Sequence, residues 1–305
     1  MKKRFTGLVA ATVTPLLPDG SIDVAQVGRL VDHLLRNQVS GMYVCGSTGE
    51  GPLLTGEERR RTAEAFIEAA AGRLPVIVHV GHSSPAEARQ LAAHTQAAGA
   101  DAIAAVPPWY FKPGSIDVLI DCLAEVAAGA PELPFYYYHI PSITGVSLDL
   151  LELLRQGPER IPNFAGAKYT ANTVDEFQAM VAYEGGRFDL LFGRDEMLLS
   201  GLAAGARGAV GTTYNYAAPL YQRLIQAFET GDLAAARNFQ SQAISMIRIL
   251  LRYGGVPGSK AIMKFLGIDC GPVRLPLVGL DRAAEQSMKA ELEASGFFDW
   301  IRPVA

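Results

Sequence analysis

The regular alternation of short apolar runs with longer stretches of helical periodicity is the strongest constraint on how this sequence can fold. The apolar runs are rich in Val, Ile and Tyr, which favour strands. In the stretch 84–98, apolar side chains recur at i, i+3 and i+4 after a Ser84-Pro85 start and before a Gly99 stop, as in an amphipathic helix. The predicted strands are 7–14, 41–45, 76–80, 102–106, 135–140, 164–168, 190–192 and 208–211.

Eight strands, each followed by a helix, predict an α/β fold of the (β/α)8 or TIM-barrel class. An open, doubly wound sheet is the alternative, but its glycine-rich dinucleotide-binding fingerprint is absent from the sequence. Three further helices are predicted after the eighth unit, over 233–253, 259–266 and 283–294. We therefore expect a catalytic barrel over residues 1–230 and a C-terminal helical extension over residues 231–305.

Composition and charge exclude several classes of protein. A hydrophobic fraction of 49% supplies a large core and argues against a disordered chain. The formal net charge is −4 and no basic run exceeds Arg59-Arg60-Arg61, so we expect no binding to nucleic acid. No apolar stretch has the length that a membrane-spanning helix needs. The scattered Cys45, Cys122 and Cys270 predict neither a disulfide framework nor a zinc site, which favours a cytoplasmic protein without a metal.

The end of the sixth strand offers a candidate nucleophile, because barrels of this class carry their chemistry at the carboxyl ends of the strands. The period of two in Gly166-Ala167-Lys168-Tyr169-Thr170 places Gly166, Lys168 and Thr170 on one face. If this face points inward, Lys168 is removed from water, which favours the neutral amine that forms Schiff bases with ketones. Local sequence leaves the alternative of a solvated or carboxylate-paired lysine open.

Three other strand ends carry polar groups. Tyr138 shares a face with Tyr136, opposite His139, and its hydroxyl is suited to proton transfer unless the ring serves only in packing. The segment Gly46-Ser47-Thr48-Gly49-Glu50-Gly51 is either a carboxylate-binding loop of hydroxyls and amides or an ordinary turn. In Gly193-Arg194-Asp195-Glu196, the carboxylates are suited either to gripping sugar hydroxyls or to capping the next helix.

Taken together, these strand ends resemble the pyruvate-dependent class I aldolases, the family that includes dihydrodipicolinate synthase and N-acetylneuraminate lyase. The resemblance covers essentially the whole chain. It implies a (β/α)8 barrel with three C-terminal helices, usually assembled as a homotetramer, and a reaction that uses no cofactor. The matching pieces are Gly46-Ser47-Thr48-Gly49-Glu50, Tyr138-His139-Ile140-Pro141, Lys168 within Gly166-Ala167-Lys168-Tyr169-Thr170, and Gly211-Thr212-Thr213-Tyr214-Asn215.

The resemblance also implies roles for individual residues. Lys168 is expected to be the Schiff-base lysine, and Tyr138 the proton-transfer tyrosine. Ser47 and Thr48 are expected to hold the carboxylate of pyruvate. Tyr110 matches a tyrosine that members of this family insert into the proton relay of a neighbouring subunit. The other predicted substrate-binding residues are Thr170, Gly193, Asp195, Glu196, Val210 and Thr212.

The residues after Tyr138 distinguish branches of this family. The synthases carry an arginine where this chain has Ile143, and a neutral side chain cannot clamp the carboxylate of aspartate semialdehyde. The run 135–141, Ser47 in place of the synthases' threonine, and Asp195 with Glu196 resemble the lyases that act on sialic acid. Arg194, and Thr212 where the lyases often carry serine, depart from the lyase pattern, and the methyl group of Thr212 would narrow the sugar pocket.

The expected reaction is therefore the reversible cleavage of N-acetylneuraminate to pyruvate and N-acetylmannosamine. An aldolase or dehydratase for a 2-keto-3-deoxy sugar acid or a 4-hydroxy-2-oxo acid is the first alternative. A non-catalytic sensor of sugar acids is the second, although binding alone requires neither Lys168 nor Tyr138.

Overall fold

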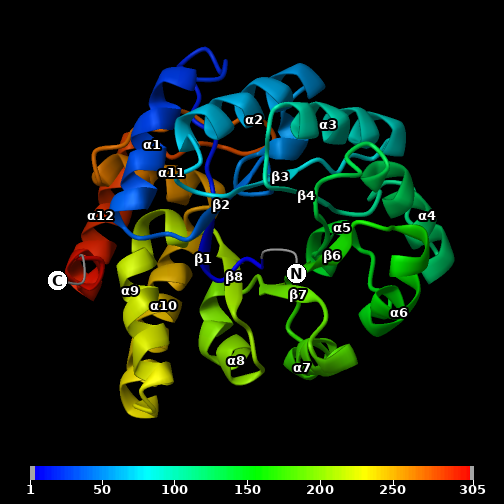
Figure 1. Ribbon diagram of the computed structural model, residues 1–305. Coiled ribbons are helices and arrows are strands. Elements are labelled where there is room, and N and C mark those ends of the chain that lie inside the picture. The colour runs from blue at the N-terminus through cyan, green and yellow to red at the C-terminus, as the bar shows by residue number, and fades with distance from the viewer. Residues whose placement is uncertain (1–3, 303–305) are drawn as a thin grey trace.

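The computed structural model describes residues 4–302, and its centre is a closed barrel of eight parallel strands ringed by helices (Figure 1). The strands follow one another around the barrel in chain order, and β1 pairs with β8 to close it. The predicted barrel fold and its eight strands are confirmed. The strands are β1 (Gly7–Ala11), β2 (Gly41–Val44), β3 (Val76–His79), β4 (Ala102–Ala105), β5 (Phe135–His139), β6 (Phe164–Tyr169), β7 (Asp189–Phe192) and β8 (Gly208–Gly211).

Helices connect each strand to the next and cover the outside of the barrel. The predicted helix start at Ser84 is confirmed, because the Ser84 side chain accepts a hydrogen bond from the Glu87 amide, and a capping box that was not predicted joins Thr55 and Glu58 at the start of the helix Gly56–Ala70. The helices are α1 (Val24–Arg36), η1 (Gly51–Leu53), α2 (Gly56–Ala70), α3 (Pro85–Ala97), α4 (Ile116–Ala127), α5 (Pro141–Thr144), α6 (Leu150–Arg160), α7 (Val174–Ala182), η2 (Tyr183–Gly185), η3 (Asp195–Met197), α8 (Leu198–Ala203) and α9 (Tyr214–Glu229).

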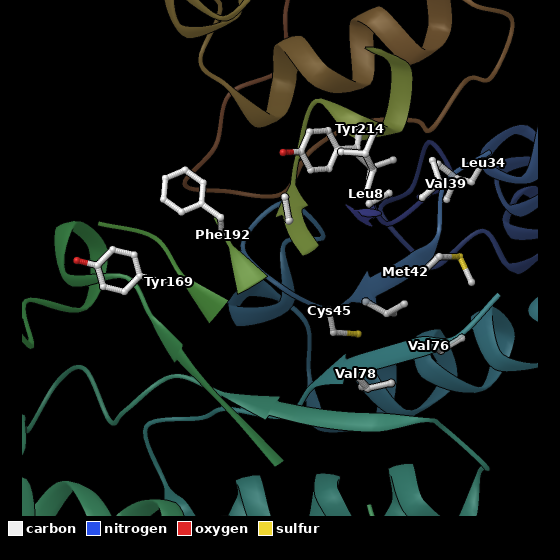
Figure 2. Packing of buried hydrophobic residues seen from close by; sticks show 14 of the residues in the cluster. Leu8, Leu34, Val39, Met42, Cys45, Val76, Val78, Tyr169, Phe192 and Tyr214 are labelled. Carbon is white, nitrogen blue, oxygen red and sulfur yellow. The ribbon is translucent and has the colours of Figure 1, made fainter. Parts of the chain in front are cut away.

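The alternation of side chains along each strand separates two buried clusters. Inward-pointing residues, among them Tyr43, Tyr138 and Val210, fill the barrel. Outward-pointing residues pack against the helices, and Figure 2 shows part of this outer layer, including Met42 and Val76. These side chains fill the interior, so the functional groups of such a barrel are expected at its mouth, at the carboxyl ends of the strands.

After the barrel come α10 (Leu233–Arg252), α11 (Val256–Phe265) and α12 (Arg282–Ser295), close to the three predicted helices. Helix α11 begins three residues before the predicted start, with Pro257 in its first turn, and the short α13 (Phe297–Trp300) was not predicted. We place the division between barrel and extension at 230/231, in the turn between α9 and α10. Across residues 4–302, every helix is too short or too polar to span a lipid bilayer.

Candidate active site

Lys168 is buried at the carboxyl end of β6, on the inward face of the barrel. Its side chain is only 4% exposed. The amine lies 4.0 Å from the centre of the Tyr138 ring and 4.2 Å from the centre of the Tyr43 ring. The two tyrosine rings meet edge to face, with their centres 5.7 Å apart. Strands β2, β5 and β6 thus hold one amine between two aromatic rings.

The two buried lysines of residues 4–302 have different surroundings. Lys260 lies 2.7 Å from the carboxylate of Glu50, whereas no carboxylate within these residues forms an ion pair with Lys168. The carboxylate-paired alternative that the sequence left open for Lys168 is therefore not observed. An unpaired amine in a desolvated site is available to attack a carbonyl group.

Sequence reasoning missed Tyr43 and His79, whose rings pack against Tyr138 beside Lys168. The hydroxyl of Tyr43 is buried without a hydrogen-bond partner among the described residues. The His79 ring meets the Tyr138 ring edge to face, and burial holds its pKa well below the usual value. The neutral ring is fixed between the Cys45 carbonyl, 3.2 Å away, and the Val106 amide, 3.3 Å away. Both residues lie in short, wholly buried strands, where the sequence alone does not reveal which face points inward.

The loop after β2 presents hydroxyl and amide groups at the barrel mouth. The hydroxyls of Thr48 and Thr212 lie 2.6 Å apart and join this loop to the end of β8. Thr14 anchors the loop from the other side, because its hydroxyl donates to the Gly49 carbonyl at 2.6 Å. Ser47 is partly exposed between these anchors. The loop is therefore held by hydrogen bonds on two sides, and it carries the hydroxyl and amide groups that suit a carboxylate.

Asp195, at the start of η3, is buried against the end of β8. One carboxylate oxygen accepts hydrogen bonds from the Thr213 amide at 2.8 Å and the Thr213 hydroxyl at 2.6 Å. The other oxygen lies against Gly211, where a Cβ atom would come within 1.9 Å of it. Burial raises the pKa of Asp195 to about 6, although the hydrogen bonds from Thr213 act in the opposite direction.

The neighbouring Glu196 has a different environment. Its carboxylate is about one-third exposed and forms an ion pair with Arg194 at 2.9 Å. Asp195 is not the helix cap that the sequence left open, because the N-cap of η3 is Arg194, but both carboxylates do lie in the first turn of η3. The carboxylate of Glu196 is therefore partly exposed, whereas that of Asp195 is buried.

Thr170 and Gly193 lie in contact at the ends of β6 and β7. The Thr170 hydroxyl is buried without a partner among the described residues. A Cβ atom on residue 193 would come within 2.1 Å of this hydroxyl, so glycine is needed for the close approach. Val210 is fully buried inside the barrel.

Tyr110 lies apart from the other predicted site residues. It is 77% exposed in the segment after β4, and its ring meets the exposed ring of Phe111 edge to face. Ile143, at the position that distinguishes family branches, is 66% exposed on α5. His139 points outward and stacks on Tyr169, as its position opposite Tyr138 predicted. Residues 4–302 contain no group of three or more His, Cys, Asp or Glu side chains arranged to hold a metal ion.

Comparison with known proteins agrees with this geometry. The dihydrodipicolinate synthetase family matches residues 4–295. The N-acetylneuraminate lyase of Pongo abelii is 43% identical to this chain, over 98% of the chain and 95% of the relative. The solved N-acetylneuraminate lyase of Proteus mirabilis is 39% identical and superposes with a TM-score of 0.94, over 97% of this chain and all of the relative. The sialic acid aldolase of Aliivibrio salmonicida also superposes at 0.94 and 39% identity, over 97% of this chain and 98% of that chain.

Proposed function

The chain belongs to the dihydrodipicolinate synthetase family, and from this premise we propose that it is a carbon–carbon lyase that cleaves N-acetylneuraminate reversibly to pyruvate and N-acetylmannosamine. One observation carries the proposal. Lys168 is buried without an ion pair between two tyrosine rings, in a barrel that matches N-acetylneuraminate lyases over nearly its whole length. The experiment below tests both the covalent step and the substrate.

In the proposed reaction, the neutral amine of Lys168 attacks the 2-keto carbon of the open-chain sugar acid. The attacking nitrogen passes one of its protons to this keto oxygen and the Tyr138 hydroxyl supplies a second, so that the oxygen leaves as water and a protonated iminium ion remains on Lys168. The Tyr138 oxygen, aided by the substrate carboxylate, then takes the proton of the C4 hydroxyl. The C3–C4 bond breaks, its electrons neutralise the iminium to an enamine, and C4 becomes the aldehyde carbon of N-acetylmannosamine. Protonation of the enamine at C3 and hydrolysis then release pyruvate and restore Lys168.

We assign the keto-acid end of the substrate to the loop after β2. The hydroxyls of Ser47 and Thr48 and the loop amides would donate hydrogen bonds to the carboxylate. The anchors at Thr14 and Thr212 support this assignment, because they fix the loop before substrate binds. A preorganised binding site avoids the cost of ordering the loop during each turnover.

We assign the polyol end to the loops after β6, β7 and β8. We assign the binding of sugar hydroxyls to the partly exposed carboxylate of Glu196 and to the hydroxyl of Thr170, which is buried without a partner among residues 4–302. The buried Asp195 would support this binding site through its hydrogen bonds with Thr213. The shape of the pocket is assigned to Gly193, Val210 and Thr212. Ile143 supports the lyase over a synthase, because an exposed apolar side chain offers no cation for a second carboxylate.

We propose a homotetramer in which Tyr110 enters the proton relay of a neighbouring subunit. The 77% exposure of this tyrosine supports a role outside its own chain. We place the protein in the cytoplasm, because its three cysteines are free thiols and Cys45 and Cys270 are buried.

Reductive trapping tests the proposal directly. Incubation with pyruvate and borohydride should add one pyruvyl group to Lys168, identified by peptide mass mapping, and the Lys168→Met variant should add none. Pyruvate release should be measured from N-acetylneuraminate, 2-keto-3-deoxygluconate and 4-hydroxy-2-oxoglutarate in parallel. Labelling of a different lysine would overturn the mechanism, and faster release from another keto acid would transfer the assignment to a relative. Trapping without turnover of any of these substrates would favour a sensor.

A further inference from the structure

Glu50 ends the proposed carboxylate-binding loop, and its side chain points toward the C-terminal extension rather than into the proposed substrate site. Glu50 closes the loop after β2 with φ of 56°, in the left-handed region that a residue other than glycine seldom adopts. Its side chain is completely buried. A backbone conformation of this kind persists only where surrounding contacts hold it. The contacts of Glu50 therefore determine the shape of the loop that carries Ser47 and Thr48.

Those contacts come from the C-terminal extension. Lys260, on α11, places its amine 2.7 Å from one carboxylate oxygen of Glu50. The backbone amide of Arg274 donates to the other oxygen at 2.9 Å. Lys260 also donates to the Pro272 carbonyl at 2.6 Å, which ties the helix to the segment that contains Arg274. Two parts of the extension thus converge on one carboxylate, more than 200 residues away in the sequence.

The Arg274 side chain fastens this segment to the barrel. Its guanidinium donates to the Gly20 carbonyl at 2.7 Å, the Leu53 carbonyl at 3.1 Å and the Glu58 carboxylate at 2.7 Å. The hydrogen bond from Arg274 is the largest cause that lowers the pKa of Glu58 to about 2. In Figure 1 the orange segment after α11 runs across toward α2. The extension is therefore joined to the loops after β1 and β2, at the barrel mouth.

We propose that Lys260 and Arg274 are positioning residues for substrate binding, which act through Glu50 to hold the 46–50 loop in the geometry that receives the substrate carboxylate. Removing one member of a buried ion pair leaves the other charge buried without a partner, which is strongly unfavourable. Without Lys260, the Glu50 carboxylate would therefore move toward solvent, and the 46–50 loop would move with it. The anchors at Thr14 and Thr212 hold the loop on the barrel side only. The proposal rests on the proposed function, because it assumes that this loop binds the keto-acid carboxylate.

The test compares two lysines one turn apart on α11. Lys260→Met keeps a long apolar side chain and removes the charge. Lys264→Met is the matched control, because Lys264 forms an exposed ion pair with Glu285 on α12, away from the loop. For each protein, trapping by borohydride is measured against pyruvate concentration, well below the melting temperature. We expect Lys260→Met to raise the half-saturating pyruvate concentration about 10-fold or more, with the same plateau of labelled Lys168, because small displacements of binding groups weaken binding strongly.

A second variant keeps the proposal testable if Lys260→Met does not fold. Glu50→Gln retains the shape of the side chain and an acceptor for the Arg274 amide, and it should also raise the half-saturating concentration. The double variant should be no worse than the poorer single variant, because the two residues act as a pair.

The outcomes separate the two proposals. If Lys260→Met or Glu50→Gln melts at a lower temperature but saturates with pyruvate as Lys264→Met does, the pair is merely structural and the inference is wrong. If the wild-type protein is not labelled by pyruvate, the proposed function is wrong, whatever the variants do. Lys260→Arg keeps the charge, so pyruvate saturation like that of the wild-type protein in this variant, but not in Lys260→Met, would support the inference. If both variants saturate with pyruvate as the wild-type protein does, the inference is wrong.

Discussion

Lys168 and Tyr138 face each other as direct partners in the ladder between β6 and β5, with the lysine amine 4.0 Å from the centre of the tyrosine ring. Backbone pairing, rather than a flexible loop, therefore fixes the proposed nucleophile beside its proposed proton donor. Tyr43 approaches the same amine to 4.2 Å from β2. The site thus contains two tyrosines at similar distances from the amine, and only Tyr138 is assigned to catalysis. Removing each hydroxyl in turn can test this assignment.

The first prediction is that removing the Tyr138 hydroxyl strongly lowers turnover and slows, but does not prevent, Schiff-base formation, because water can supply the proton for the loss of the keto oxygen. Tyr138→Phe keeps the ring beside Lys168 and removes only the hydroxyl that is proposed to transfer protons. We expect kcat for N-acetylneuraminate to fall by about 10²-fold or more, while pyruvate is still trapped on Lys168. Steady-state pyruvate release and borohydride labelling provide the two measurements.

Tyr43→Phe is the matched control for this variant. Its hydroxyl is buried without a partner among residues 4–302, so its loss should cost little stability and leave kcat within about 3-fold of wild type. If the two variants lose activity equally, Tyr138 has no special role in the relay, and the assignment must be revised.

The second prediction concerns stability and pH. The pKa of Asp195 is raised to about 6 in the folded protein by burial, against an ordinary value near 3.8. The folded state therefore binds this proton more tightly than the unfolded state. Its contribution to stability is fully present below pH 3.8 and is lost as the pH rises through about 6, a loss of roughly 3 kcal/mol for a shift of this size.

Asp195→Asn removes this titration while keeping the shape of the side chain. The variant should gain stability relative to wild type as the pH rises from 4 to 7, because only the folded wild-type protein must bury a carboxylate charge as its proton is lost. Melting temperatures of both proteins across this range, in buffers of equal ionic strength, measure the difference. A constant gap between the two melting curves would show that Asp195 does not titrate there.

The third prediction concerns the contact between β6 and β7. In Gly193→Ala the new Cβ atom would lie 2.1 Å from the Thr170 hydroxyl and 2.8 Å from the Tyr169 carbonyl, so the strand ends must shift. We expect a loss of about 1–3 kcal/mol in stability and a lower kcat/KM for N-acetylneuraminate. Gly28→Ala, in α1, is the control, because nothing lies within 4 Å of its Cβ position and alanine favours the helix. Equal melting temperatures for the two variants would contradict the predicted clash.

The sequence predicted the strands well because local patterns encode them. The period of two in 164–170 placed Lys168 on a face that the structure shows to be inward, and the same rule placed His139 outward against Tyr169. The ends of strands were less predictable. β1 stops at Ala11 rather than residue 14, and Thr14 instead donates its hydroxyl to the Gly49 carbonyl of the neighbouring loop.

The contacts that shape the site were beyond local patterns, because they join distant segments. No spacing rule relates Glu50 to Lys260, and a buried charge pair leaves no periodic signal. Asp195 illustrates a different limit. Its sequence context suggests a sugar-binding or capping carboxylate, but only the fold reveals that Thr213 supplies two hydrogen bonds to one of its oxygens.

The final prediction tests substrate choice through Glu196, whose carboxylate is paired with Arg194 at 2.9 Å and about one-third exposed. If this carboxylate accepts hydrogen bonds from the sugar tail, Glu196→Gln should lower kcat/KM for N-acetylneuraminate about 10-fold, because an ionised acceptor contributes roughly 1.5–3 kcal/mol per hydrogen bond and a neutral amide less. Pyruvate labelling of Lys168 should be unchanged, because the keto-acid end is assigned to the loop after β2. Glu152→Gln, which disrupts a similarly exposed ion pair with Arg155 on α6, is the control for a general loss of charge. An unaltered kcat/KM in Glu196→Gln, or faster turnover of pyruvate with aspartate semialdehyde by the wild-type protein, would contradict a polyol-binding role and require another substrate for this site.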